Sequence, residues 1–353
     1  MRKLGFLFLI FAVIIFAAIM YRLRIDGVQN FSKTSIQEVV DTSVSSKESY
    51  IFIPYWTVDN GIEDAPFNTL IYFGIDASVN GVNTSEDGYK KLPMFREFSG
   101  RKKTLLTVRM LDSEENSDIL KNKKVQDKII SESTALAKQY GFSGIVLDLE
   151  MKGLPFDSLI NRITDFNKSF NEASEKEGLS FSTLIYGDVY YRIRPYDVKK
   201  ISVYSDRIFV MSYDFSKSNG NPGPNFPLEG RDAYGYDFKT MVSDFKKEVP
   251  VSKLTFVFGM FGYDWEVDTN GKSKGSAVAK TTLQMERMIT GCVTEKTCTV
   301  LLDLLSQETK VTYQKDGEAR VAWFETSHST DKKITYLKSQ GLESVGWWAY
   351  SYF

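Results

Sequence analysis

The stretch GFSGIVLDLE, residues 141–150, ends an apolar run with two carboxylates placed two residues apart. Side chains alternate along a strand, so Asp148 and Glu150 share one face with Val146, while the apolar residues between them share the other. The α-carbons of the two acids would lie about 7 Å apart, close enough for one charge to raise the pKa of the other carboxyl. Such a carboxyl suits general acid catalysis near neutral pH. The alternatives are structural carboxylates bonded to Arg or Lys, or a divalent-metal site.

The low numbers of histidine and cysteine exclude several kinds of catalytic and metal site. His328 is the single histidine, so a multi-histidine zinc site is impossible and a Ser-His-Asp triad would have to include it. It lies in a polar stretch before a predicted helix, and we expect it at the surface. Cys292 and Cys298 are too few for a four-thiolate metal cage; they could form a disulfide outside the cytoplasm or remain thiols inside it. The chemistry must rest on carboxylates, hydroxyls and amides, and we expect no metal and no cofactor.

The charged residues are almost balanced, with 44 Lys and Arg against 45 Asp and Glu. The formal net charge of −1 gives no electrostatic reason to expect a nucleic-acid partner. Aromatic residues make up 14% of the chain, which suits a cleft that stacks sugars, although a core explains most of this content equally well.

Short apolar runs alternate with amphipathic stretches from residue 50 onward. The predicted strands are Tyr50–Trp56, Thr69–Ile75, Lys103–Arg109, Gly144–Glu150, Leu179–Gly187, Arg207–Asp214, Leu254–Met260 and Ser344–Tyr350. Eight strands with helical crossovers predict an α/β fold, a (β/α)8 TIM barrel. The alternative, an open doubly wound sheet, would need an early glycine-rich phosphate loop, and the sequence has none. In the barrel, Asp148 and Glu150 would face the axis at the carboxyl end of the fourth strand.

One segment between the seventh and eighth strands breaks the alternation. Residues 309–325, TKVTYQKDGEARVAWFE, contain two β-patterned runs joined by Asp316 and Gly317, the strongest short hairpin signal. We predict a small β-hairpin insertion in a barrel loop, on the face where such barrels build their sites.

The N-terminus predicts the compartment. Arg2 and Lys3 precede an apolar run of seventeen residues, 4–20. That length is the lower bound for a spanning helix and no small-x-small cleavage site follows, so we expect residues 1–24 to form an uncleaved signal anchor, a transmembrane helix, rather than a cleaved signal peptide. Residues 25–49 would be a juxtamembrane linker and residues 50–353 the barrel. The prediction is a single-pass protein of the cell membrane with an extracytoplasmic barrel.

Two motifs carry a resemblance to a known family. FSGIVLDLE resembles the fourth-strand signature of glycoside hydrolase family 18, Asp-Gly-x-Asp-x-Asp-x-Glu, with Gly144, Asp148 and Glu150 in register. VMSYDF resembles the sixth-strand Met-x-Tyr-Asp of that family, and its matching residues are Met211, Tyr213 and Asp214.

Three further segments resemble the bacterial cell-wall and spore-germination branch of the family. They are PGPNFPL, FGMFGYDW, and RVAWFE followed by YLKSQGLESVGWW. In the last segment Trp348 falls on the eighth-strand tryptophan that forms the floor of the sugar site. The matches follow the expected order from Tyr50 to the C-terminus.

The resemblance implies a retaining mechanism in which the 2-acetamido oxygen of the substrate, rather than a protein nucleophile, attacks the anomeric carbon. Glu150 would protonate the glycosidic oxygen and later deprotonate water, and Asp148 would hold the acetamido N–H and stabilise the developing positive charge. Tyr213 would donate a hydrogen bond to the acetamido carbonyl, and Asp214 would help bind the sugar. The predicted substrate contacts are Trp348, Met211, Tyr55 and Tyr263.

The sequence departs from the family signature at two positions. The first Asp is Ser143 here, which would change a structural hydrogen bond and little else. The second Asp is Val146, and in the family that carboxyl partners the next one and shares its proton. Asp148 would then rely on Ser, Tyr or backbone donors nearby, and activity could be reduced.

We therefore predict a membrane-tethered, extracytoplasmic glycosidase that hydrolyses β-linked N-acetylglucosamine-containing glycan. Peptidoglycan or another envelope polymer is preferred over chitin, because the branch resembled acts on cell walls and the anchor would keep the enzyme at its own envelope. The first alternative is a non-catalytic, lectin-like carbohydrate-binding barrel, for which Val146 is the best argument. The second is an envelope scaffold.

Overall fold

The computed structural model describes residues 48–353, so the predicted anchor, residues 1–24, and nearly all of the predicted linker lie outside the described residues. Within the described part of the chain, no helix combines the length and the apolar character needed to cross a membrane.

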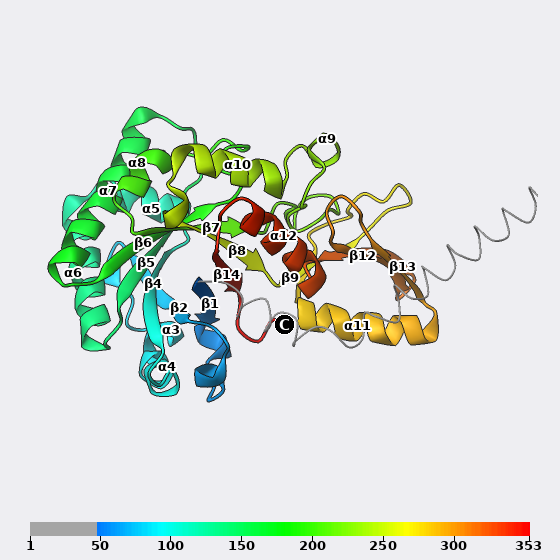
Figure 1. Cartoon of the computed structure of the whole chain (residues 1–353), viewed down its shortest axis with the longest axis horizontal. Coiled ribbons are helices and arrows are strands. Elements are labelled where there is room, and N and C mark those ends of the chain that lie inside the picture. Colours follow the sequence, from blue (N-terminus) through cyan, green and yellow to red (C-terminus); the bar gives the residue numbers. More distant parts are fainter. Residues whose placement is uncertain (1–47) are drawn as a thin grey trace, which may run out of the picture.

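Eight parallel strands form a closed barrel (Figure 1). They are β1 (Glu48–Pro54), β2 (Thr69–Ser78), β4 (Lys103–Met110), β5 (Gly144–Leu149), β6 (Ser180–Tyr186), β7 (Arg207–Ser212), β8 (Leu254–Gly259) and β14 (Ser344–Trp348). The barrel closes where β1 pairs with both β2 and β14, with Tyr50 opposite Thr69 on one side and Gly346 on the other. A short β3 (Gly81–Val82) adds an antiparallel edge to β2. The predicted strands and the TIM barrel are confirmed.

Helices cover the outside of the barrel (Figure 1). They are α3 (Asp87–Lys90), α4 (Leu92–Phe98), α5 (Ser113–Ile119), α6 (Lys123–Gln139), α7 (Asp157–Lys176), α8 (Val198–Val203), α10 (Phe238–Glu248) and α12 (Ser327–Ser339). A further short helix, α9 (Arg231–Tyr234), lies in the long loop after β7. Three 3-10 turns accompany them: η2 (Tyr55–Thr57), η3 (Ile62–Asp64) and η4 (Val251–Lys253). Side-chain caps start several of these helices: Asp112 accepts from two backbone N–H groups of α5, and Asn122 accepts from one of α6.

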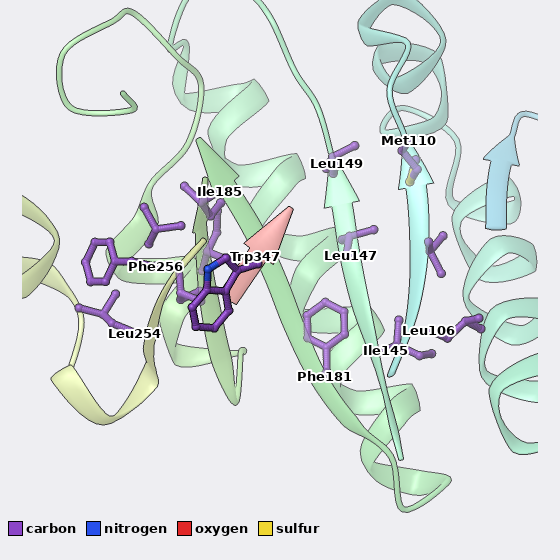
Figure 2. Close-up of a cluster of buried hydrophobic side chains, with 14 of the residues drawn as sticks. Leu106, Met110, Ile145, Leu147, Leu149, Phe181, Ile185, Leu254, Phe256 and Trp347 are labelled. Carbon is purple, nitrogen blue, oxygen red and sulfur yellow. The ribbon is translucent and has the colours of Figure 1, made fainter. Parts of the chain in front are cut away.

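Side chains of β5 alternate between two cores, as predicted. Ile145, Leu147 and Leu149 are buried in the layer between strands and helices (Figure 2). Val146 belongs instead to the apolar cluster inside the barrel, together with Phe209 and Val257. The strand therefore fills the helix layer with one face and the barrel axis with the other.

The insertion between β8 and β14 is larger than the predicted hairpin. It contains β9 (Phe261–Glu266), β10 (Val278–Thr281), α11 (Thr282–Glu295), β11 (Cys298–Leu302), β12 (Thr309–Lys315) and β13 (Glu318–Phe324). The predicted hairpin is β12 and β13, with Asp316 and Gly317 at positive φ in its turn. These strands belong to a five-stranded antiparallel sheet in the order β10-β9-β13-β12-β11. The prediction missed β9, β10, α11 and β11. Of these, β10 and β11 are short and largely exposed, without a clear apolar alternation.

Cys292 and Cys298 form a disulfide with a Cα–Cα distance of 5.4 Å, which joins the end of α11 to the start of β11. Of the two states left open by the sequence, the structure contains the bonded one. His328 is exposed near the start of α12, as expected.

A buried ion cluster joins the insertion to the barrel. Lys333 of α12 forms ion pairs with Glu308 and Glu325, and all three side chains are fully buried. Glu308 also accepts the backbone N–H groups of Asn225 and Phe226, at 2.6 and 2.8 Å. Burial raises the pKa of Glu325 to about 7, against the lowering effect of Lys333. The cluster therefore connects α12, the insertion and the long loop after β7.

Replacing Lys333 with methionine should destabilise the protein, because it leaves two buried carboxyl groups without their cation. We expect the free energy of unfolding, measured by urea denaturation, to fall by about 3 kcal/mol or more. The control is Lys239→Met, which breaks an exposed pair with Glu229 and should cost less than about 1 kcal/mol. Equal losses in the two variants would contradict a structural role for the cluster.

Candidate active site

A cleft of about 590 Å³ lies among residues at the carboxyl ends of the barrel strands. Six of the eight predicted site residues line it: Asp148, Glu150, Met211, Tyr213, Asp214 and Trp348. Its other lining residues include Trp56, Phe73, Arg109, Lys152, Tyr186, Asp188, Arg194, Lys217, Asn219 and Phe261. The strand ends thus bring together residues from most of the length of the chain.

Glu150 is held just beyond the end of β5. Its backbone N–H donates to the Met110 carbonyl at 2.8 Å, and its carbonyl accepts from Asn116 Nδ2 at 2.9 Å. The Tyr186 hydroxyl donates to Glu150 Oε2 at 2.6 Å. Burial and the charge of Glu150 raise the pKa of Tyr186, so this hydroxyl keeps its proton and remains a donor. Backbone and side chain of Glu150 are both positioned at the cleft.

Asp148 lies one layer deeper and is 2% exposed. Burial and then the charge of Glu150 raise its pKa well above the usual range, while Arg109, its partner in register on β4, acts in the opposite direction. Asp148 Oδ1 has no hydrogen-bond partner among the described residues. No Ser, Tyr or backbone donor therefore reaches this oxygen, and Val146, two residues earlier in β5, belongs to the apolar cluster inside the barrel.

Tyr213 and Asp214 follow β7 on the other side of the cleft. Burial, and then the charges of Asp148 and Asp214, raise the pKa of Tyr213 well above its usual value. Its hydroxyl is therefore a proton donor at any physiological pH. Asp214 has a left-handed backbone (φ 59°), a conformation that Asp tolerates better than most residues, and Tyr263 donates to its Oδ1 at 2.6 Å.

Asn225 holds the backbone of this loop and was not predicted. It is 1% exposed, and its Oδ1 accepts the Asp214 N–H at 2.8 Å. Its Nδ2 donates to the carbonyls of Gly259 and Phe261, both at 3.0 Å. With its own N–H bound to Glu308, Asn225 connects the ends of β7 and β8 to the insertion. The sequence carries no local signal for this role.

Aromatic rings form the floor and rim of the cleft. Trp348 packs edge-on against Phe73 at 4.6 Å between ring centroids and lies nearly parallel to Tyr213 at 6.5 Å. Trp56 is 46% exposed and lines the cleft, whereas the predicted Tyr55 does not. Strand alternation does not extend past β1, because the chain turns into η2 at Tyr55. Tyr55 packs edge-on against Trp56 at 4.9 Å instead.

Tyr263, the other predicted sugar contact, does not line the cleft either. It lies in β9 of the insertion and bonds to Asp214, so it positions an acid of the site. The cleft as a whole brings together the carboxyl group of Glu150, the buried carboxyl group of Asp148, the hydroxyl of Tyr213 and the ring of Trp348. These groups can protonate a leaving oxygen, hold an amide and stabilise a cationic sugar.

The family model described as "Glycosyl hydrolases family 18" matches residues 31–352. The Cortical fragment-lytic enzyme of Bacillus anthracis is 22% identical over 306 residues, which cover 80% of this chain and 65% of that protein. The protein of the same name from Bacillus subtilis (strain 168) is 22% identical over 240 residues, 65% of this chain and 51% of that protein. The chain thus spans between about half and two thirds of these curated relatives.

Solved structures share the fold. The Bacillus cereus spore cortex-lytic enzyme SleL has a TM-score of 0.71 at 18% identity, covering 87% of this chain and 71% of that one. A GH18 chitinase from Cycas revoluta in complex with (GlcNAc)3 has a TM-score of 0.70 at 19% identity, covering 86% and 94%. At sequence identities this low, the structural similarity shows that the chains share the barrel fold.

Replacing Asp148 with asparagine should stabilise the protein at neutral pH. Because the pKa of Asp148 is higher in the folded than in the unfolded chain, the folded state binds more protons, and its stability falls as the pH rises above the usual range of the carboxyl. We expect Asp148→Asn to unfold at higher urea concentration than the wild type at about pH 7, with the difference shrinking toward about pH 4. A variant that is less stable than the wild type at both pH values would contradict the raised pKa of Asp148.

Proposed function

Because this chain belongs to glycosyl hydrolases family 18, we propose that it hydrolyses a β-linked glycan that contains N-acetylglucosamine, in the cell envelope. One observation carries the proposal: Glu150, Asp148, Tyr213 and Asp214 converge in a single cleft with Trp348. This set has the acid, the amide-holding groups and the aromatic surface that cleavage of an N-acetylated sugar needs.

The proposed mechanism is retaining and substrate-assisted. Glu150, fixed by Tyr186, would give its proton to the glycosidic oxygen and later take one from water. Asp148 would accept the acetamido N–H at its free Oδ1. Tyr213, which keeps its proton, would donate to the acetamido carbonyl and hold that oxygen against the anomeric carbon. Substrate would thus supply the hydrogen-bond partner that Asp148 lacks in the free protein.

Peptidoglycan is the preferred polymer. The relatives are named for lysis of the spore cortex or its fragments, and the solved chitinases for chitin, a polymer of the same N-acetylated sugar. These names are a guide to the glycan class, since the chain spans only part of the curated relatives.

The second candidate is a carbohydrate-binding barrel without turnover. Val146 favours it, because an apolar residue beneath Asp148 cannot share a proton with that carboxyl during a catalytic cycle. The cleft and its aromatic rings would still bind sugar.

Hydrolysis is tested with purified peptidoglycan and a chito-oligosaccharide, with products identified by mass spectrometry. We expect wild-type protein to release fragments and Glu150→Gln, which removes the acid without changing its shape, to lower the rate at least about a hundredfold. If the wild type binds glycan but releases no fragments, hydrolysis is ruled out and the carbohydrate-binding barrel is supported.

Inhibition by a thiazoline analogue of the acetamido intermediate would support the substrate-assisted step, whereas trapping by a fluoro-sugar would contradict it.

We also propose that residues 1–24 anchor the barrel outside the cytoplasmic membrane. The disulfide between Cys292 and Cys298 supports this location, because such bonds persist in oxidising compartments. Protease added to intact cells should then remove the barrel, as measured by immunoblotting, while a cytoplasmic control protein survives. A barrel protected until the cells are lysed would reverse the proposed topology.

A further inference from the structure

Lys217 is a half-buried cation in the cleft, in the loop that follows β7. Burial lowers its pKa, and the charges of Asp214 and Asp188 only partly oppose this effect. No carboxylate of the described residues forms an ion pair or hydrogen bond with its amino group. A partly desolvated ammonium without a counter-ion is unfavourable, so an anion bound at this position would stabilise the charged form of Lys217.

The two nearby acids are already occupied by other residues. Asp188 accepts Arg194 Nε at 2.6 Å and also bonds to Arg192, so both of its oxygens bind guanidinium groups. Asp214 accepts the Tyr263 hydroxyl. Asp188 is therefore not available as the direct partner of Lys217, and among the described residues no ion pair joins Asp214 to Lys217.

Arg194 adds a second cation to the same wall of the cleft. Its guanidinium lies 3.5 Å from the ring centroid of Tyr186, the residue that holds Glu150. Asp188 pairs with both Arg192 and Arg194, whereas Lys217 has no ion pair among the described residues. Arg194 and Lys217 line the cleft together with the candidate catalytic acid, Glu150.

We propose that Lys217, with Arg194 beside it, binds a carboxylate carried by a sugar next to the bond that is cleaved. The inference rests on the proposed function and narrows it, since the cleft would select acidic N-acetylated glycans over neutral ones. An ammonium suits this task because it is a compact charge on a flexible stem that can follow a substituent of the sugar ring. N-acetylmuramic acid, whose lactyl ether ends in a carboxylate, has the required chemistry.

The test compares matched tetrasaccharides. One is neutral chitotetraose, one alternates N-acetylglucosamine with N-acetylmuramic acid bearing free carboxylates, and one is the methyl ester of the second. We expect wild-type kcat/KM to be about 10- to 100-fold higher for the acidic substrate than for its ester. Lys217→Met should abolish most of that ratio, and added salt should reduce it in the wild type. Lys124→Met, on the exposed face of α6, is the charge-matched control and should keep the ratio.

Binding to Glu150→Gln separates this inference from hydrolysis itself. If calorimetry shows tighter binding of the acidic tetrasaccharide, and Lys217→Met in the same background removes the difference, the anion site stands even if the wild type cleaves neither substrate. If the wild type cleaves acidic and esterified substrates equally well, and Lys217→Met changes both rates by the same factor, the anion site is overturned while hydrolysis stands.

Discussion

The site depends on the strict alternation of side chains along one strand inside a closed barrel. In β5, Val146 fills the axis, Asp148 comes next at 2% exposure, and Glu150 emerges beyond the strand end. The intervening leucines complete the core against the helices. A register shift of one residue would send both acids into the helix layer and the leucines into the cleft. Core packing and chemistry are therefore specified by β5 and the residue that follows it.

The loop after β7, which carries Asp214, is positioned by residues outside the barrel strands. Asp214 takes its left-handed backbone conformation with its N–H bound to Asn225, and Asn225 is in turn bound by Glu308 of the insertion. Lys333 neutralises part of the charge of Glu308 in a fully buried setting. The loop after β7 has no regular secondary structure at Asp214. Side-chain hydrogen bonds therefore fix its position relative to the insertion.

Periodicity in the sequence located every barrel strand, because each one is an apolar run bounded by polar residues, and it directed Asp148 and Glu150 to the cleft. It does not describe the chain at Tyr55, where β1 turns into η2 and strand alternation stops. It could not find Asn225 or Glu308, whose contact joins residues 83 positions apart in loops. The insertion was underestimated because its outer strands, β10 and β11, are short and largely exposed, so their apolar residues do not alternate with polar ones as in a half-buried strand.

The link from Glu308 to the rim of the barrel bears on how such enzymes diversify. A recombination event that replaced the insertion with a short connector would keep all eight barrel strands. It would, however, leave the buried N–H groups of Asn225 and Phe226 without the acceptor that Glu308 provides. The turn that carries Glu308 and the loop that it supports therefore form one structural unit although the sequence separates them. A shorter connector would have to supply another acceptor for these two N–H groups.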